Sequence, residues 1–277
     1  MMSKDYMEMP FELAGKLIMF QATLNSKEEP FIFDSGAPCL VLNKKYEEIS
    51  ETNALQDVAG IVGHASGVQS ACVSQLKWGE LSLLEQPAVV IDISHLEAQL
   101  NVKIRGLIGY DAIKNHDVLF DYENKVVALI DPLKTEDHVK WDHFRYPLSF
   151  GNAAHLPILP ISIAGEAFNM AIDCGAEMNL LDTRHSSYIH RSRTYSPKES
   201  QSLTGVGSEI MQVQFGTIDP VCVGDQIRIG AMDFLFSDIS HLNAASSIII
   251  DGLVGYELLS KRKTIVSYKR QEVLIGA

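Results

Sequence analysis

The chain has 277 residues, of which 46% are hydrophobic and 21% are charged, a composition typical of a soluble globular protein with one large domain or two of ordinary size. Its 23 Lys and Arg residues and 35 Asp and Glu residues give a formal net charge of -12. This acidic balance argues against nucleic acid or an anionic membrane as a partner.

The predicted elements are mostly short strands. The segments concerned are rich in Val, Ile and aromatic residues and are bounded by turn residues, which is typical of strands. In chain order they cover residues 17–24, 88–93, 125–130, 226–230 and 265–269. Hairpins are also predicted, at residues 78–84 and 224–236.

The predicted helices are few and short. They cover residues 43–50, 94–100 and 110–116, and we expect Asn43 to cap the first and Ser94 the second. Strands and helices do not alternate along the chain, so the predicted fold class is all-β rather than α/β. The GLIG and GLVG runs lack the full glycine pattern and the strand–helix–strand context of a dinucleotide loop, and no cofactor is expected.

The chain also repeats itself. The sequence DISHL occurs at residues 92–96 and again at residues 238–242, an offset of 146 residues. The next segment, RGLIGYDAI, matches DGLVGYELL at the same offset. A predicted strand follows each copy and carries Tyr122 or Tyr268 at the matching position. Such internal similarity indicates a duplication.

Each half of the repeat contains one acid between apolar runs. PFIFDSGAPCLVLN, at residues 30–43, matches NMAIDCGAEMNLLD, at residues 169–182. The shared order of elements predicts two homologous lobes, residues 1–138 and residues 143–277. A charged segment with Pro at both ends, residues 131–147, contains the joint.

The two acids are Asp34 and Asp173. A lone buried charge is costly, so each needs a partner or a function. Duplicated halves tend to pack about an approximate two-fold axis, which brings the same patch of each half together. We therefore expect Asp34 to lie against Asp173 and the pair to hold one proton. Such a pair can activate a water and protonate a carbonyl oxygen, as amide hydrolysis without a covalent intermediate requires.

Glycines are expected to shape this site in two ways. Gly36 and Gly175, two residues after each acid, permit a tight turn and a close approach of the other lobe's backbone. A glycine-rich stretch follows each motif, and we expect it to form a mobile hairpin tip over a cleft. The glycines of these predicted flaps are Gly60, Gly63, Gly67, Gly205 and Gly207.

These motifs resemble those of aspartic peptidases of the pepsin/retropepsin group. Residues 33–37 and 172–176 match that group's apolar-Asp-Thr/Ser-Gly-Ala/Ser motif, and residues 107–109 and 253–255 match its apolar-apolar-Gly element. The chain is similar to the compact bacterial relatives, like two retropepsin-type subunits fused in tandem. The resemblance implies an all-β bilobal barrel with an inter-lobe cleft, in which an extended peptide lies under one or two flaps.

The resemblance also assigns roles to residues. It implies that Asp34 and Asp173 are catalytic, without a metal, and that Ser35 and Cys174 face across the interface and link the two turns. Cys174 stands where the group has Thr or Ser. Because a thiol is a poor hydrogen-bond donor, we expect a lopsided link.

Two other departures from the pepsin pattern concern the surroundings of the acids. Ala37 and Ala176 follow the glycines, as in retroviral enzymes. Pepsins have Ser at this position. The loss of a hydroxyl near each acid predicts a working pH nearer neutral than that of pepsin. In addition, neither predicted flap holds the Tyr that pepsin-like flaps usually have.

Other chemically active groups favour structural interpretations. The cysteines share no metal-ligand spacing, so no metal site is predicted. We expect His95 and His241, in the DISHL copies, to be repeat scaffold. The basic residues 184–198 predict a solvated loop, with a role in substrate selection as the alternative. The four cysteines are expected to be buried reduced thiols: Cys39, Cys72, Cys174 and Cys222.

The leading hypothesis is an aspartic endopeptidase, monomeric, that acts on a peptide or protein substrate. The rival is a catalytically inactive peptide-binding or interaction module on the same barrel, motivated by Cys174. A peptidase completed only by dimerisation is a third class, against which two full motifs in one chain argue. No run reaches 18 apolar residues and no signal peptide is seen, so we expect no membrane span and a chain that is cytoplasmic as written, or exported if a leader was removed.

Overall fold

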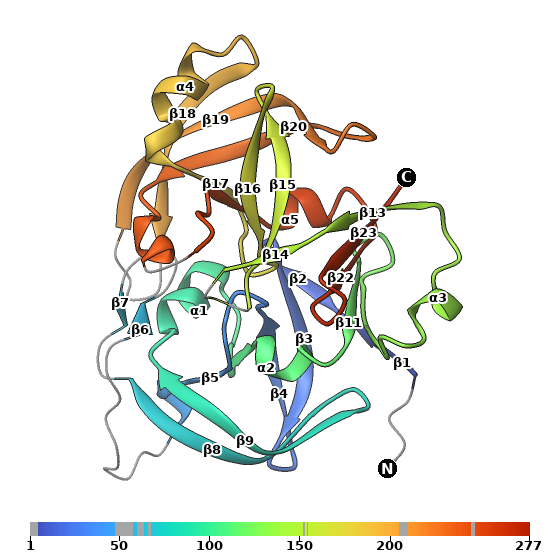
Figure 1. Cartoon of the computed structure of the whole chain (residues 1–277). Coiled ribbons are helices and arrows are strands. Elements are labelled where there is room, and N and C mark those ends of the chain that lie inside the picture. Colours follow the sequence, from blue (N-terminus) through green and yellow to red (C-terminus); the bar gives the residue numbers. More distant parts are fainter. Residues whose placement is uncertain are drawn as a thin grey trace.

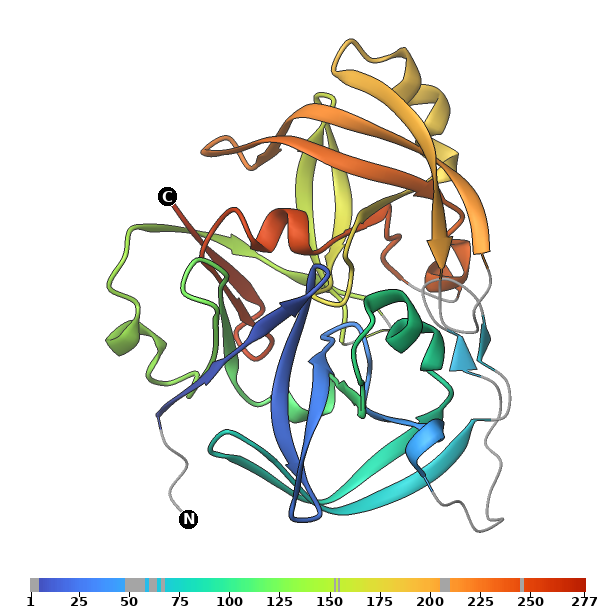
Figure 2. The same ribbon diagram turned by 180° about the vertical axis from the view of Figure 1, so that it is seen from behind.

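The computed structural model describes residues 5–47, 58–59, 64–65, 68–151, 153, 155–204, 210–244 and 247–277. Within these ranges the strands form three large sheets and one small pair, β6 (Val58–Ala59) with β7 (His64–Ala65). Figure 1 shows one large sheet at the bottom, one at the top and the third to the right, between the other two. The same three parts are seen from behind in Figure 2.

The first large sheet comes from the first half of the chain. Its seven strands have the order β2-β3-β4-β10-β5-β9-β8, and β3 also pairs with β8, so the sheet closes on itself. The bounds are β2 (Glu12–Ala14), β3 (Leu17–Leu24), β4 (Lys27–Phe33), β5 (Leu40–Asn43), β8 (Gln69–Trp78), β9 (Leu81–Ile91) and β10 (Gly106–Ile108).

The second large sheet comes from the second half and repeats this plan. Its eight strands have the order β14-β15-β16-β21-β17-β20-β19-β18, with an additional pairing of β15 and β19. The bounds are β14 (Ser149–Phe150), β15 (Pro157–Ile163), β16 (Glu166–Ile172), β17 (Asn179–Asp182), β18 (Tyr195–Thr204), β19 (Ile210–Val223), β20 (Ile227–Ser237) and β21 (Gly252–Val254).

The third sheet joins the two halves. Its order is β1-β12-β11-β22-β23-β13, so three strands come from the first half and three from the segment after it. At its centre Leu119 pairs with Ile265, its own counterpart in the repeat. An approximate two-fold axis therefore passes through this pair. The bounds are β1 (Tyr6–Pro10), β11 (Asp117–Asp121), β12 (Val126–Ile130), β13 (His143–Pro147), β22 (Thr264–Ser267) and β23 (Glu272–Gly276).

The described helices are short and lie between strands, so the all-β class is confirmed. The longest, α1 (Ser94–Leu100), has seven residues. The remaining α-helices are α2 (Tyr110–Ile113), α3 (Thr135–His138), α4 (Ser186–Arg191) and α5 (Tyr256–Leu259). Three 3₁₀ turns complete the set: η1 (Lys44–Tyr46), η2 (Thr183–His185) and η3 (Ser240–Asn243).

Burial patterns explain why the strands next to the acids are rigid. Most of β3 alternates between buried and more exposed residues, as a strand with one solvated face does. By contrast, Phe31, Ile32 and Phe33 at the end of β4 are all buried, and so is the whole of β5. Phe33 packs against Trp78 with ring centroids 5.0 Å apart and against Phe120 of the third sheet at 5.9 Å. Covered on both faces, these strands hold the turn between them in one position.

One of the two predicted helix caps is confirmed and the other is wrong. Asn43 caps η1, since its side chain accepts a hydrogen bond from the Lys45 amide at 3.2 Å. Ser94 is instead the first residue of α1, and its amide and hydroxyl both donate to Asp92 Oδ1, at 2.9 and 2.6 Å. A carboxylate accepts from both groups more strongly than a serine hydroxyl could cap, so the preceding acid takes the role.

The predicted joint contains ordered structure. Both α3 and β13 fall within residues 131–147, and β13 pairs with β23 at the edge of the third sheet. The lobe limits of 1–138 and 143–277 remain a proposal. No helix in the described part of the chain is long and apolar enough to cross a membrane.

Candidate active site

The two Asp motifs occupy the same place in their sheets. Asp34 directly follows β4, and its amide donates to the carbonyl of Ile108 in β10 at 3.0 Å. Asp173 directly follows β16, and its amide donates to the carbonyl of Val254 in β21 at 2.9 Å. In each half, the strand of the apolar-apolar-Gly element thus fixes the start of the turn that carries the acid.

The glycines of the apolar-apolar-Gly elements are needed because backbone passes close beside them. A Cβ at Gly109 would lie 2.4 Å from the Ala37 carbonyl oxygen, and one at Gly255 would lie 2.2 Å from that of Ala176. The next amide along the chain donates to the same carbonyl in each half, at 2.8 Å for Tyr110 and at 3.1 Å for the matching tyrosine. Any side chain at these glycines would push the turn away.

The structure brings the two acids together. Asp34 and Asp173 are hydrogen-bonded through their side chains. The Gly36 amide donates to Oδ1 of both acids, at 3.0 Å in each case, and the Gly175 amide donates to Asp173 Oδ1 at 2.8 Å. A Cβ at Gly36 would lie 2.3 Å from Asp173 Oδ2, and one at Gly175 would lie 2.2 Å from Asp34 Oδ1. Each glycine therefore gives the other half's carboxyl its space.

Burial raises the pKa of both acids, and the charge of Asp34 adds to the rise at Asp173. Burial raises the pKa of Asp34, while its hydrogen bonds with Asp173, Gly36 and Ala37 oppose that rise. Burial and the charge of Asp34 hold the pKa of Asp173 well above its ordinary value. Asp173 is only 1% exposed, whereas Asp34 is partly exposed. The neutral form is therefore favoured more strongly at Asp173 than at Asp34.

Ser35 and Cys174 link the two turns across the interface. The Cys174 amide donates to Ser35 Oγ at 3.0 Å, and the Ser35 amide donates to Cys174 Sγ at 3.2 Å. The thiol also donates to the Phe33 carbonyl at 3.5 Å. Both links are present, and the asymmetry lies in their chemistry, because sulfur is a weaker acceptor than oxygen.

A second contact between the halves, which the sequence did not reveal, lies beside the Asp173 turn. Glu177 Oε1 accepts from the Lys16 amide at 2.8 Å. The Lys16 ammonium lies 3.2 Å from Glu257 and 5.3 Å from the centre of the Tyr256 ring. Gly15, with φ +60°, makes the close approach possible, since a Cβ there would lie 2.4 Å from Glu177 Oε1. The β2–β3 turn of one half is thus bound to the motif of the other.

Other predicted features either fall outside the described residues or differ in the structure. Gly60, Gly63, Gly67, Gly205 and Gly207, the glycines of the predicted flaps, lie outside the described residues. The basic residues 184–198 form η2, α4 and the start of β18 rather than a loop, because Ile189 on α4 is completely buried. Within the described ranges, no three His, Cys, Asp or Glu side chains gather as metal ligands would.

The structure also describes the surroundings of the four cysteines and of the two DISHL copies. All four cysteines are free, but only Cys174 is buried; Cys72 is exposed because it points outward from the alternating strand β8. In the DISHL copies the conserved feature is the acid: Asp92 accepts from the Ser94 amide and Asp238 from the Ser240 amide, each at 2.9 Å.

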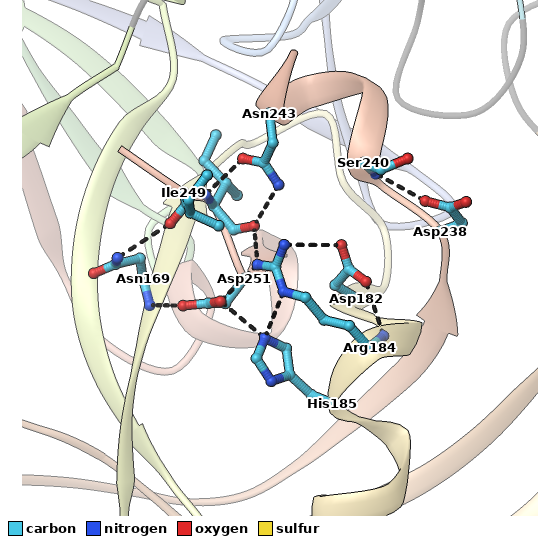
Figure 3. A network of polar contacts seen from close by, with 10 residues as sticks. Asn169, Asp182, Arg184, His185, Asp238, Ser240, Asn243, Ile249 and Asp251 are labelled. Atoms are coloured by element: carbon cyan, nitrogen blue, oxygen red, sulfur yellow. Dashed lines mark hydrogen bonds and ion pairs between the residues drawn. The ribbon is translucent and has the colours of Figure 1, made fainter. Parts of the chain in front are cut away.

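A separate polar cluster lies in the second half, around Asp251 (Figure 3). Asp251 Oδ1 lies 2.6 Å from Arg184 Nη2 and 2.8 Å from His185 Nε2. Its other oxygen accepts from the Asn169 amide at 2.9 Å. Arg184 also donates to the Ile250 carbonyl at 2.7 Å. The cluster ties η2 to the segment before β21.

The arrangement of the sheets is that of the pepsin-like aspartic proteinases: two mainly β lobes with the two acids between them. A solved structure with this fold is the aspartic proteinase from Irpex lacteus. The match has a TM-score of 0.59 and covers 98% of this chain and 97% of that chain, at 10% sequence identity. No family model matches the sequence, and no curated protein matches it.

Proposed function

We propose that the protein is an aspartic endopeptidase in which Asp34 and Asp173 are the catalytic residues. The observation that carries the proposal is the buried, hydrogen-bonded pair of carboxyls, with the pKa of Asp173 held well above its ordinary value. Asp34, the ionised member, would take a proton from a water that attacks the peptide carbonyl. Asp173, the protonated member, would donate to the carbonyl oxygen. The pepsin-like fold supports an extended peptide in a cleft between the lobes.

The local geometry supports this division of roles. The Gly36 amide bonds to both acids, which holds the two carboxyls in one orientation. The apolar strands around them keep the dielectric low, so the two acids influence each other strongly. Fixed hydrogen-bond donors around a pair of coupled acids are what preorganised acid–base catalysis requires.

The test is cleavage of a peptide library by the wild-type protein and by two variants, Asp34→Asn and Asp173→Asn. Each replacement leaves the shape of the side chain but removes a proton donor or acceptor, so kcat/KM should fall at least about 1,000-fold. The wild-type profile of kcat/KM against pH should be bell-shaped, with two limbs that report the two apparent pKa values of the coupled pair. Asp137→Asn, at a carboxylate that is 69% exposed, serves as the control and should cleave normally.

Two results would overturn the proposal. One is full turnover in both variants. The other is binding of peptides by the wild-type protein without cleavage at any pH from acid to neutral, which would favour a non-catalytic peptide-binding module on the same fold.

A further inference from the structure

Asn179 is a completely buried polar side chain close behind the turn that carries Asp173. It is the first residue of β17, six residues after Asp173, and is 0% exposed. Its Nδ2 donates to the carbonyl of Asp233 in β20 at 2.8 Å, and its Oδ1 accepts from the Gly255 amide at 3.3 Å. One side chain thus joins the backbone of β20 to the backbone just before α5.

The backbone at Gly255 is in contact with the acid-carrying turn. Val254, the residue before it, accepts from the Asp173 amide at 2.9 Å. A Cβ at Gly255 would lie 2.5 Å from the Asp173 carbonyl oxygen. Because Gly255 is buried, its amide would be left without a partner if Asn179 were lost, and such an amide is costly where it cannot reach water. A shift of Gly255 toward another acceptor would move the Asp173 turn with it.

The other end of the Asn179 contact is firmly held. The Asp233 carboxylate accepts from Lys198 Nζ at 2.7 and 2.8 Å, and from the Thr217 hydroxyl. Lys198 belongs to β18 and Thr217 to β19, the two strands next to β20 in the sheet. Asn179 therefore binds a carbonyl whose residue is fixed to three strands.

The repeat shows that a buried amide group is not needed at this position for folding. The residue that matches Asn179 is Leu40, six residues after Asp34, and it is 3% exposed and packed in the apolar core. Burying an apolar side chain stabilises the fold, whereas burying an amide group is costly unless every polar atom is hydrogen-bonded. A side chain that is retained despite this cost, and that bonds to the backbone beside one acid, points to a role in placing that backbone.

We propose that Asn179 is a positioning residue for Asp173. It fixes the Gly255 amide to the backbone of β20, and so keeps the Asp173 carboxyl where the Gly36 amide of the other half meets it at 3.0 Å. Since Asn179 is completely buried, it acts through the turn and does not meet substrate. This inference rests on the proposed peptidase function, to which it adds a residue that places one of the two acids.

The test compares Asn179→Ala with Asn43→Ala. Asn43 is also 0% exposed and also joins two backbone groups, since it donates to the Ile104 carbonyl at 3.0 Å and accepts from the Lys45 amide at 3.2 Å. However, it is the last residue of β5 and has no contact with either acid-carrying turn among these bonds. Both variants should lower the urea concentration at the unfolding midpoint, because each loses two buried hydrogen bonds.

Only Asn179→Ala should affect the site. Its kcat for peptide cleavage should fall at least about tenfold with KM unchanged, because a displaced turn misplaces the acid and not the bound peptide. A ¹³C titration should give Asp173 a lower pKa in this variant than in the wild type, because a displaced turn leaves the carboxyl less buried. Asn43→Ala should keep kcat within about twofold and leave the pKa of Asp173 unchanged.

Two further measurements keep the test decisive. If Asn179→Ala does not fold, Asn179→Leu removes the same hydrogen bonds and supplies the side chain that the first half has at this position. In the wild-type protein, hydrogen exchange should be as slow at the Gly255 amide as at the Asp173 amide, since the two open together.

Three results would overturn the inference. One is an equal loss of kcat in Asn179→Ala and Asn43→Ala. The second is a lower unfolding midpoint in Asn179→Ala with kcat and the pKa of Asp173 unchanged, since the role would then be structural only. The third is free exchange of the Gly255 amide in the wild-type protein.

Failure of the proposed function is distinguishable from failure of this inference. If the wild-type protein cleaves no peptide, the function fails, while the titration of Asp173 and the exchange of the Gly255 amide still decide whether Asn179 places the turn. If cleavage is seen and Asn179→Ala changes neither kcat nor the pKa of Asp173, the function stands and the inference fails.

Discussion

At the scale of single residues, the site depends on which of two similar carboxyls keeps a proton. Asp173 is almost completely buried and faces the charge of Asp34, so its neutral form is favoured. Asp34 is less buried and accepts from the amides of Gly36 and Ala37, so it keeps its charge more easily. The same D-x-G-A pattern thus produces two chemically different acids, because the halves do not bury them equally.

This difference predicts how stability varies with pH. Because the folded pKa of Asp173 is raised, the folded state binds more protons than the unfolded state above the ordinary pKa of 3.8. Stability is therefore lost as pH rises from that value through the folded pKa, at a rate of at most about 1.4 kcal/mol per pH unit. Asp173→Asn removes this titration. The free energy of unfolding should therefore fall less in the variant than in the wild type as pH rises over the same range.

Urea unfolding at a series of pH values measures the difference. The control is Asp137→Asn, at a solvent-exposed carboxylate, whose difference from wild type should not change across this range. A constant difference between Asp173→Asn and wild type from pH 4 to 7 would show that Asp173 titrates normally and would contradict the assignment.

At the scale of elements, the two lobes use the same backbone frame with reversed charges. The carbonyl of Pro30 accepts from Arg105 in the first half, and that of Asn169 accepts from Asp251 in the second, at 2.7 and 2.9 Å. The side chains at this position then differ: Arg105 pairs with Glu47 at 2.7 Å, whereas Asp251 pairs with a cation. Each lobe therefore has an ion pair between the turn after the motif and the segment before the central strand. The positive and negative partners have exchanged places between the two lobes.

The second-half cluster of Figure 3 predicts a measurable cost when its central charge is removed. Asp251→Asn keeps an oxygen that can accept from the Asn169 amide but weakens the contacts with Arg184 and His185. Since Asp251 is only 17% exposed, we expect a loss of about 1–2 kcal/mol in the free energy of unfolding. Peptide cleavage should survive.

The matched control is Asp111→Asn on α2, which breaks an exposed pair with Lys114, the residue that caps the end of this helix. Its cost should stay below about 0.5 kcal/mol, because exposed ion pairs contribute little. Thermal unfolding of both variants gives the comparison. Equal costs at the two sites would show that the Asp251 cluster is an ordinary surface pair.

How far the sequence predicts this molecule depends on the range of the interactions. The strand at residues 17–24 and the helix at 94–100 were predicted with their bounds, because apolar pattern and turn residues act locally. The all-β class followed from short strands that do not alternate with helices, and the two lobes followed from the duplication. That the buried Tyr122 hydroxyl has no hydrogen-bond partner among the described residues was not predicted, since it depends on how the two halves pack. The outward face of Cys72 was missed because the register of its strand is set by its partners.

The candidate site shows the same division. The repeat predicted that Asp34 and Asp173 would meet, and the structure has them hydrogen-bonded; that they are catalytic remains a prediction. Which of them holds the proton could not be read from two identical D-x-G-A patterns. That property arises from unequal burial, which only the packed molecule defines.

At the scale of the whole molecule, the pair of acids exists only because the halves close on each other. The central strands β11 and β22 come from different halves and pair in the third sheet. The Lys16 contacts join the halves again beside the Asp173 turn. Between these two attachments, the Ser35–Cys174 links hold the turns together. A site made of one carboxyl from each half is therefore as well defined as the interface itself.

The most direct test of this account is a titration of the aspartate carboxyls by ¹³C NMR, with Asp34→Asn and Asp173→Asn used to assign the two resonances. We predict that one carboxyl, Asp173, stays protonated well above pH 3.8, and that Asp34→Asn lowers its pKa because a neighbouring negative charge is removed. If both carboxyls titrate independently near their ordinary pKa, they share no proton, and the central claim is contradicted.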